Sequence, residues 1–490
     1  MRLPHRSLLL VSFLTFACFA FAQEGWVSLF DGKTLAGWKA SENPGSPRVE
    51  NGAIVCEGKR AHLFYVGADG QAEFENFELE LEVQTEPGAN SGVYFLTKWQ
   101  DSGWPNVGFE AQVNNKQPPF KEYDYRENKK TASLYGLRNL YKPMAVDGEW
   151  FTMNVKVARP RVEIRLNGKL VSDYIEPANP VLPSPAKLNL LGKGTFALQC
   201  HDEDSRARYR NIRVRRLPPG EDASVTKPVY SEQDLRRLAL GKDNFPIVNL
   251  RVRTGAKLTP AGLQELRLRT GVFPGLVYSL KSSEEVRNDD DALATIAKTS
   301  AEPVFVGLDV SSAYYIEQPA GPPRLTAETK AKFDFLVARK TLGVTDGEYF
   351  EINPRQETPA MSDVADHIVH KIESQPIDVF AGVMVLPRGF KQPAEVLWTE
   401  ELMQRVIAAA AKHGVAFEID LRERTPSEKF IKLAKAAKVK FTFGSDTTTI
   451  ENYGDWSYAL EMQEAAGLGW KDIWVPGHQP TRAQRELQKN

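Results

Sequence analysis

Cysteine, histidine and net charge are all scarce in this chain. Its 490 residues include three cysteines and seven histidines, and 62 basic against 63 acidic residues leave a net charge of −1. That balance argues against a nucleic-acid partner, or an anionic membrane, recognised by charge. Beyond the N-terminal run, no segment is apolar enough to span a bilayer. The length exceeds one ordinary core, so two or three domains are expected.

The first 22 residues have the pattern of a secretory leader. Basic side chains at positions 2, 5 and 6 precede the apolar run Leu8–Phe21, and a small-x-small cleavage site ends at Ala22. The run is shorter than the roughly 20 residues that a spanning helix needs. We therefore expect cleavage after Ala22 and a periplasmic or extracellular protein.

Cys56 and Cys200 are the cysteines left after that cleavage. An oxidising compartment permits a disulfide between them. Two buried thiols that act as small hydrophobic side chains are the alternative. The sequence leaves both open.

The pattern of residues 23–217 is typical of an all-β domain. Short alternating runs recur between Gly, Asn and Pro, without amphipathic helices between them, which predicts a sandwich or jelly roll. The expected strands are Ala53–Cys56, Phe77–Gln84, Gly92–Thr97, Phe109–Val113, Phe151–Val157, Val162–Leu166, Phe196–Cys200 and Tyr209–Val214.

Two of these strands carry polar side chains on one face. In Phe196–Cys200 and the residue after it, alternation places Gln199 and His201 opposite the apolar Phe196, Leu198 and Cys200. In 107–115 it places Glu110, Gln112 and Asn114 opposite Val107, Phe109, Ala111 and Val113. A buried carboxylate or amide without partners is costly, so these faces are expected to line a ligand pocket. A solvated sheet face with ordinary cross-strand pairs is the alternative.

Several motifs of this region resemble the 3-keto-glucoside lyase/hydratase family, also called the 3-keto-disaccharide hydrolase family. They are LFDGKTLAGWK, GANSGVYF at 88–95, GWPNVGFEAQVNN at 103–115, KKTASLYG at 129–136 and GTFALQCHDEDSRARYRNIRVRRLP from Gly194. The resemblance implies a concanavalin-like jelly-roll sandwich that acts on oxidised sugars. Leu96 departs from the family, whose members often carry a polar residue there.

The resemblance implies cleavage of 3-keto-glycosides by C2 proton abstraction, β-elimination and hydration, with a non-catalytic carbohydrate-binding sandwich as the alternative. The candidate catalytic residues are His201, Glu110 and Asp202, and the same three are candidate ligands of one divalent metal. The candidate sugar-binding residues are Gln112, Asn114, Lys130, Tyr135, Asn90 and Gln199.

After a linker at 218–243, residues 244–480 alternate strand-like and helical runs, which predicts a mostly parallel, helix-wrapped α/β sheet or barrel. A tail follows at 481–490. The expected strands are Ile247–Val252, Val304–Leu308, Val379–Leu386, Val415–Ile419 and Lys440–Phe443, and the expected helices are Pro260–Thr270, Ala327–Arg339, Thr399–His413 and Ser427–Ala437.

This half resembles the PHP (polymerase and histidinol phosphatase) barrel family through the run that starts at Phe245 and the run GVAFEIDLRERTPSEKFIKLAKAAKVKFTFGSD. The resemblance implies a metal cluster, but the matching positions are Asn249, Arg251, Arg253 and Asp446. Arginine has no lone pair for a metal. We expect a metal-free pseudoenzyme barrel, in which the arginines either bind an anion or pair with Asp309, Glu418 and Asp420.

Overall fold

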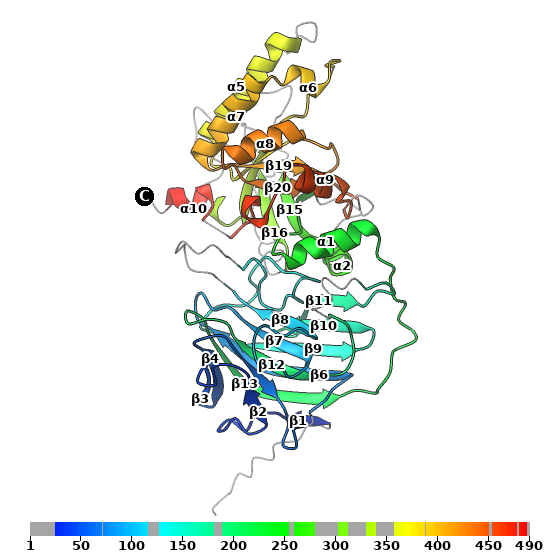
Figure 1. Ribbon diagram of the computed structural model, residues 1–490. Coiled ribbons are helices and arrows are strands. Elements are labelled where there is room, and N and C mark those ends of the chain that lie inside the picture. The colour runs from blue at the N-terminus through cyan, green and yellow to red at the C-terminus, as the bar shows by residue number, and fades with distance from the viewer. Residues whose placement is uncertain are drawn as a thin grey trace, which may run out of the picture.

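The computed structural model describes residues 25–70, 72–115, 127–180, 189–253, 259–279, 302–311, 330–339, 357–387, 389–449, 453–477 and 480–487. The expected leader at 1–22 lies outside these residues. Figure 1 shows two parts, a β-rich N-terminal part and a mixed C-terminal part. They are called the sandwich and the barrel below.

The sandwich consists of two antiparallel sheets. The larger sheet has the order β11-β10-β9-β6-β13-β4-β3, with β1 also paired to β13, and the smaller has the order β2-β5-β12-β7-β8. The strands are β1 (Trp26–Ser28), β2 (Trp38–Ala40), β3 (Pro47–Glu50), β4 (Ala53–Glu57), β5 (Ala61–Tyr65), β6 (Phe77–Thr85), β7 (Ser91–Thr97), β8 (Phe109–Val113), β9 (Phe151–Ala158), β10 (Arg161–Leu166), β11 (Lys169–Ile175), β12 (Thr195–Cys200) and β13 (Arg206–Arg216).

The eight strands expected in this half are all present, while β1, β2, β3, β5 and β11 were not expected. Alternating residues of β6, such as Phe77, Leu79 and Leu81, are buried between the sheets. Phe196 and Phe77 contact each other there with ring centroids 5.0 Å apart. The apolar face of each expected strand therefore forms the sandwich core.

The outer face of the larger sheet carries a ladder of charge pairs. Arg210 and Arg213 of β13 pair with Glu82 and Glu80 of β6 at 2.6 and 2.5 Å. These pairs are partly exposed and contribute little stability one by one. The arginine-rich run near residue 210 therefore belongs to a solvated sheet face.

The barrel is a parallel sheet of seven strands in chain order. The chain of hydrogen bonds nearly closes, because the Arg253 amide of the first strand donates to Thr447 O just after the last. The strands are β14 (Val248–Arg253), β15 (Phe273–Ser279), β16 (Phe305–Asp309), β17 (Phe335–Arg339), β18 (Val379–Ala381), β19 (Ala416–Asp420) and β20 (Phe441–Gly444). The helices are α1 (Glu232–Lys242), α2 (Pro260–Thr270), α5 (Glu357–Ser374), α6 (Ala394–Leu397), α7 (Glu400–His413), α8 (Glu428–Ala436), α9 (Ser457–Ala465), α10 (Arg482–Leu487) and the 3-10 turn Trp470–Asp472.

Three expectations for the barrel were wrong. The segment Ala327–Arg339 was expected to be one helix, but β17 occupies Phe335–Arg339. Phe335, Leu336 and Val337 are all buried, and a buried parallel strand lacks the alternation that would distinguish it from a helix. The strand expected over Val379–Leu386 stops at Ala381, because Gly382 adopts a φ of 63°.

The third correction concerns the C-terminal tail. The expected tail contains α10, and the Arg482 amide at its start donates to Asp378 Oδ1 at 2.9 Å. The end of the described chain is therefore attached to the barrel. Among the described residues, no helix has the length and apolarity needed to cross a membrane.

The sandwich and the barrel share one continuous core. Arg138 of the sandwich donates from Nε to Leu268 O (2.8 Å) and from Nη2 to Arg269 O (3.1 Å), at the carbonyl end of α2. Tyr141 Oη accepts from the Ile247 amide at 2.9 Å. The segment 127–142 of the sandwich therefore contacts the barrel directly. The helices α1 and α2 lie at the junction between the two parts (Figure 1).

Candidate functional site

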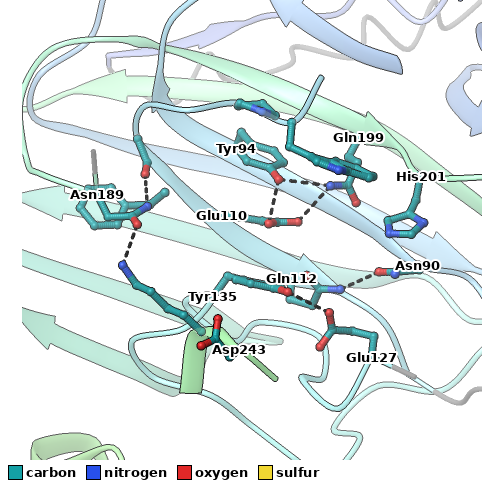
Figure 2. A pocket seen from close by; sticks show the side chains of 15 residues that line it. Asn90, Tyr94, Glu110, Gln112, Glu127, Tyr135, Asn189, Gln199, His201 and Asp243 are labelled. Atoms are coloured by element: carbon teal, nitrogen blue, oxygen red, sulfur yellow. Dashed lines mark hydrogen bonds between the residues drawn. The ribbon is translucent and has the colours of Figure 1, made fainter. Parts of the chain in front are cut away.

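A cavity of about 590 Å³ opens on the outer face of the smaller sheet. Figure 2 shows polar side chains of β7, β8 and β12 directed into it. The wall also includes residues from the barrel side of the junction. The lining residues are Asn90, Tyr94, Trp104, Pro105, Gly108, Phe109, Glu110, Gln112, Glu127, Tyr135, Asn189, Gln199, His201, Lys242 and Asp243.

Strand alternation places the main polar groups in this pocket. Phe109, Ala111 and Val113 point into the core, so Glu110 and Gln112 face the cavity. Phe196, Leu198 and Cys200 likewise point inward, so Gln199 and His201 face the same cavity. The expected convergence of the two strands is confirmed.

Glu110 sits in a network of neutral partners. The Tyr94 hydroxyl donates to Glu110 Oε2 at 2.8 Å, and Gln199 Nε2 donates to Glu110 Oε1 at 3.3 Å. Burial is the largest influence on Glu110 and raises its pKa to about 8, against the opposing effect of the Tyr94 hydrogen bond. The carboxyl is therefore protonated at neutral pH.

A glycine makes room for this carboxyl. A Cβ at Gly92 would lie 2.2 Å from Glu110 Oε1. Gly92 and Gln112 are cross-strand partners, and Tyr94 and Glu110 are the next pair on the same face of the sheet. The absence of a side chain at position 92 thus fixes where the Glu110 head group lies.

His201 follows directly after β12 and is oriented by its neighbour. Its Nδ1 lies 2.6 Å from Asp202 Oδ2, which leaves Nε2 for the cavity. Burial disfavours the Asp202 anion, but the hydrogen bonds from His201 and Ser205 outweigh it and lower the Asp202 pKa. The Trp104 ring packs against the His201 ring in a tilted arrangement, with centroids 5.0 Å apart and an interplanar angle of 37°.

Asn90 and Gln112 form a second polar pair. Gln112 Nε2 donates to Asn90 Oδ1 at 2.7 Å, while Gln112 Oε1 and Gln199 Oε1 have no hydrogen-bond partner although both atoms are buried. An unpaired buried carbonyl oxygen costs free energy unless a ligand or water donates to it. These two oxygens therefore keep accepting capacity that the described side chains do not use.

Three of the predicted residues do not line the cavity. Asn114 and Lys130 are buried behind it, where Lys130 Nζ donates to Asn114 Oδ1 at 3.0 Å. Asp202 contributes through His201 and not through the wall itself. Asn90, Gln112, Tyr135, Gln199, Glu110 and His201 all line the cavity as expected.

The expected metal ligands do not gather. Nowhere in the described part of the chain do three His, Cys, Asp or Glu side chains come close enough to hold a metal ion, so Glu110 does not join His201 and Asp202. The residues present do not fit a divalent metal, and we derive no step through one.

Leu96 does not face the cavity. Strand parity groups it with Tyr94, but its φ of 53° breaks the alternation and its side chain packs into the core. The backbone at Leu96 also meets Gly108, where a Cβ would lie 2.7 Å from its carbonyl oxygen. The departure from the family at this position therefore removes no polar group from the pocket.

Sequence reasoning missed the lining residues Tyr94, Trp104, Glu127, Asn189, Lys242 and Asp243. Tyr94 shares the polar face of β7 and could have been found by alternation. Glu127 is buried against Lys129, with Oε1 3.3 Å from Nζ, and accepts from the Tyr135 hydroxyl at 3.1 Å. Lys242 and Asp243 come from the expected linker, and only the docking of the barrel places them here.

The two cysteines are free and buried in the core. Burial raises the Cys56 pKa well above its ordinary value, and Cys200 lies close enough to add to that effect. Of the two alternatives, the structure contains the pair of buried thiols.

Arg251 and Arg253 of the barrel form an ion network with the carboxylates around them. Arg251 donates to both oxygens of Glu418 at 2.6 Å and lies 2.7 Å from Asp420 Oδ2 and 2.8 Å from Asp446 Oδ1. Arg253 pairs with Asp446 and reaches Asp309 at 3.5 Å. The pairing alternative is therefore confirmed.

Asn249 is fully buried at the same end of the barrel and donates to Ser445 Oγ at 2.8 Å. Burial raises the pKa of Glu418 to about 7, although Arg251 opposes the shift. The guanidinium of Arg251 lies between Glu418, Asp420 and Asp446, where its positive charge compensates the negative charge of the carboxylates.

Comparison with known proteins supports the reading of the sandwich. Residues 25–215 match the model of the 3-keto-alpha-glucoside-1,2-lyase-like domain family. A curated 3-keto-disaccharide hydrolase from Bacteroides thetaiotaomicron is 28% identical over 170 residues, which cover 31% of this chain. The match spans 59% of that relative's length. The sandwich is thus similar to domains of a carbohydrate-related, hydrolase-like family.

Solved structures resemble each half at low identity. A Parabacteroides distasonis protein provisionally assigned as a glycosyl hydrolase is 21% identical, with a TM-score of 0.34, over 40% of this chain and 95% of its own. A histidinol phosphate phosphatase from Lactococcus lactis is 11% identical, with a TM-score of 0.33, over 48% of this chain and 98% of its own. The α/β barrel itself is shown by the structure, and its membership of the PHP family stays a prediction.

Proposed function

We propose that the sandwich pocket binds a 3-keto-glycoside and cleaves its glycosidic bond. The observation that carries the proposal is the placement of His201, held by Asp202, on the same cavity as the protonated Glu110. A base and an acid therefore face one ligand-sized space. Burial keeps the proton on Glu110, and the contact with Asp202 leaves Nε2 of His201 for the cavity, as acid–base chemistry requires.

The proposed reaction begins at C2 of the sugar, whose proton is acidified by the neighbouring 3-keto group. The base takes this proton, and the C–H electrons move into an enolate on the C3 oxygen. The enolate then expels the glycosidic oxygen from C1, and the leaving alcohol gains a proton. Water adds across the resulting C1–C2 double bond, so that the net change is hydrolysis to the 3-keto sugar and the free alcohol.

His201 is the proposed base. Its Nδ1 faces Asp202 at 2.6 Å, so the hydrogen bond fixes the tautomer with a free electron pair on Nε2. The Asp202 carboxylate also stabilises the imidazolium formed when the C2 proton is taken. Trp104 restrains the ring from one face.

Glu110 is the proposed acid. Its carboxyl holds a proton at neutral pH because burial raises its pKa to about 8. It can therefore donate to the leaving oxygen or to the enolate, as a general acid does. Gln112 Oε1 and Gln199 Oε1 would accept from the sugar hydroxyls.

The test is to incubate the full chain with a 3-keto-glucoside carrying a chromogenic alcohol, with and without EDTA. We expect release of the alcohol in both conditions and none from the unoxidised glucoside. Binding of the sugar without any release would contradict the enzyme and establish the carbohydrate-binding module. Loss of activity with EDTA, restored by a metal, would restore the expected metal site.

We propose further that the protein is exported and that the barrel is a metal-free pseudoenzyme. The leader pattern up to Ala22 supports export, and intact mass after expression with the leader would show cleavage there. The Arg251 network supports the second point, since a cation occupies the position between three carboxylates. Stoichiometric zinc or manganese lost on Glu418→Gln would overturn it.

A further inference from the structure

The wall of the pocket crosses the junction between the sandwich and the barrel. Lys242, the last residue of α1, and Asp243, its C-cap, line the same cavity as Glu110 and His201 (Figure 2). We propose that Asp243 binds a sugar hydroxyl and makes the helix α1 a specificity-determining part of the pocket. The inference rests on the proposed function, because it assumes a sugar as the ligand.

Buried contacts hold α1 in place at the pocket. Asn128 donates to Asn244, from its amide to Oδ1 at 3.0 Å and from Nδ2 to the carbonyl at 2.9 Å. Lys129 Nζ also donates to Asn244 Oδ1, at 3.1 Å. All three residues are buried, so the segment next to Asp243 is anchored by polar contacts that are costly to break.

The rim above β8 is closed from the same helix. Lys242 Nζ donates to Asn189 Oδ1 at 2.9 Å, and Asn189 Nδ2 donates to Gly108 O at 2.6 Å. The approach is close, because a Cβ at Gly136 would lie 2.4 Å from Lys242 Cγ. The close contact with Gly136 and the hydrogen bond to Asn189 therefore fix the position of the last turn of α1.

Asp243 is the acidic group of the pocket with unused acceptors. Its side chain is exposed and makes no hydrogen bond to any described residue, whereas Glu127 accepts from Lys129 and Tyr135. Glu110 is occupied by Tyr94 and Gln199. Together with the free oxygens of Gln112 and Gln199, Asp243 presents acceptors to a ligand that must supply donors.

Asp243 favours a neutral sugar rich in hydroxyls over one that places an anionic group against its carboxylate, although the Lys242 ammonium on the same wall attracts an anion. A carboxylate that accepts from a hydroxyl forms a charge-assisted bond, and the same charge repels a sugar acid. The expected effect of removing it is therefore twofold. Affinity for the neutral sugar falls, and discrimination against its acidic analogue falls as well.

The experiment measures binding of 3-keto-glucose and of its 6-carboxylate analogue to the full chain by calorimetry. These probes are not consumed, so the readout does not depend on turnover. Asp243→Ala should weaken 3-keto-glucose binding roughly 10-fold or more. Asp243→Asn should reduce the ratio of the affinity for 3-keto-glucose to the affinity for its 6-carboxylate analogue. Glu232→Ala, at the exposed start of the same helix, is the matched control and should bind as the wild type does.

The outcomes separate the two proposals. Wild-type binding without turnover of a 3-keto-glycoside overturns the enzyme but leaves the Asp243 measurement valid. Equal binding by wild type and Asp243→Ala overturns the role of Asp243, whatever the turnover. Failure of the wild type to bind 3-keto-glucose overturns the role of Asp243, and the turnover assay decides the enzyme separately. Equal thermal unfolding of the variants would show that any change in affinity is local.

Discussion

Burial and hydrogen bonding act in opposite directions on the two acids nearest the proposed chemistry. Burial is the largest influence on Glu110 and, together with the nearby Glu127 charge, outweighs the hydrogen bond from Tyr94, so the Glu110 pKa rises to about 8. Asp202 is bonded to His201, and the hydrogen bonds prevail over burial and lower its pKa. One carboxyl thus keeps its proton at neutral pH and the other does not, which is the division that a base–acid pair needs.

The first prediction concerns the base. His201→Gln should lower kcat on a 3-keto-glycoside roughly 10²- to 10⁴-fold, because the group that accepts the C2 proton is gone. His370→Gln, at an exposed position on α5, is the control. Similar rates for both variants would remove His201 from the mechanism. Asp202→Asn should cause a smaller loss, since it disturbs the tautomer and leaves the ring in place.

The second prediction concerns pH. The folded-state pKa of Glu110, about 8, lies above its ordinary value of 4.5, so the folded protein holds this proton more tightly than the unfolded chain. Stability from the protonated form is present below about 4.5 and is lost as the pH rises through about 8. Glu110→Gln cannot ionise. Its melting temperature should therefore rise relative to wild type as the pH increases across that window.

Activity should follow the same group. The wild-type kcat/KM should fall as the pH rises through about 8, when Glu110 loses the proton that it donates. A pH–rate profile of wild type and Glu110→Gln compares the two. A variant that retains both the full rate and the alkaline decline would show that Glu110 is not the acid.

At the level of elements, strand alternation is local and therefore visible in the sequence. It predicted that Glu110, Gln112, Gln199 and His201 share one pocket, and the pairing of β7 with β8 and β12 confirmed it. Leu96 does not follow the alternation, because its left-handed backbone conformation turns its side chain to the core side of the sheet. Burial on all sides likewise concealed β17 as an apparent helix.

The third prediction concerns β14 and its ion network. Arg251→Met leaves the buried Glu418 and Asp420 without their arginine partner, which should cost about 3–5 kcal/mol in the free energy of unfolding, while the partly exposed Asp446 keeps Arg253. Arg422→Met removes an exposed arginine near Asp446 and should cost less than about 1 kcal/mol. Denaturant titrations of both variants provide the comparison. Equal, small losses would show that the network is not needed to hold the carboxylates.

The fourth prediction concerns the contact between α1 and Gly136. Gly136→Ala brings a Cβ against Lys242 and should displace the helix, which lowers both melting temperature and affinity for 3-keto-glucose. Gly148→Ala is a matched control, because Gly148 has a similar φ of 84° but nothing within 4 Å of the added atom. Both variants share the left-handed strain, of roughly 1–2 kcal/mol. If Gly148→Ala weakened binding equally, the contact with α1 would be unimportant.

At the scale of the whole molecule, the sequence predicted the sandwich and the barrel but not the contacts between them. The charged, proline-containing segment at 218–243 has the composition of a linker, yet α1 within it packs against the segment 127–142. Contacts of this kind join residues more than a hundred positions apart, such as Asn128 and Asn244. No local pattern encodes them, so Lys242 and Asp243 could not be assigned to the pocket from sequence.

The fifth prediction follows from the shared core. Calorimetry of the full chain should show one cooperative unfolding transition, because the core is continuous from the sandwich into the barrel. Arg138→Ala, which removes the contacts with Leu268 and Arg269, should lower that transition without splitting off a stable sandwich. Two well-separated transitions in the wild type would show that the halves are independent.

The central claim is that the pocket removes a proton from C2 of a 3-keto-glycoside. The most direct test is to run the reaction in D₂O and determine the deuterium content at C2 of the released 3-keto sugar. The account predicts one deuterium at C2, formed at the rate of alcohol release and lost with His201→Gln, beyond the exchange of product incubated alone. Release of the alcohol with only hydrogen at C2 would contradict it.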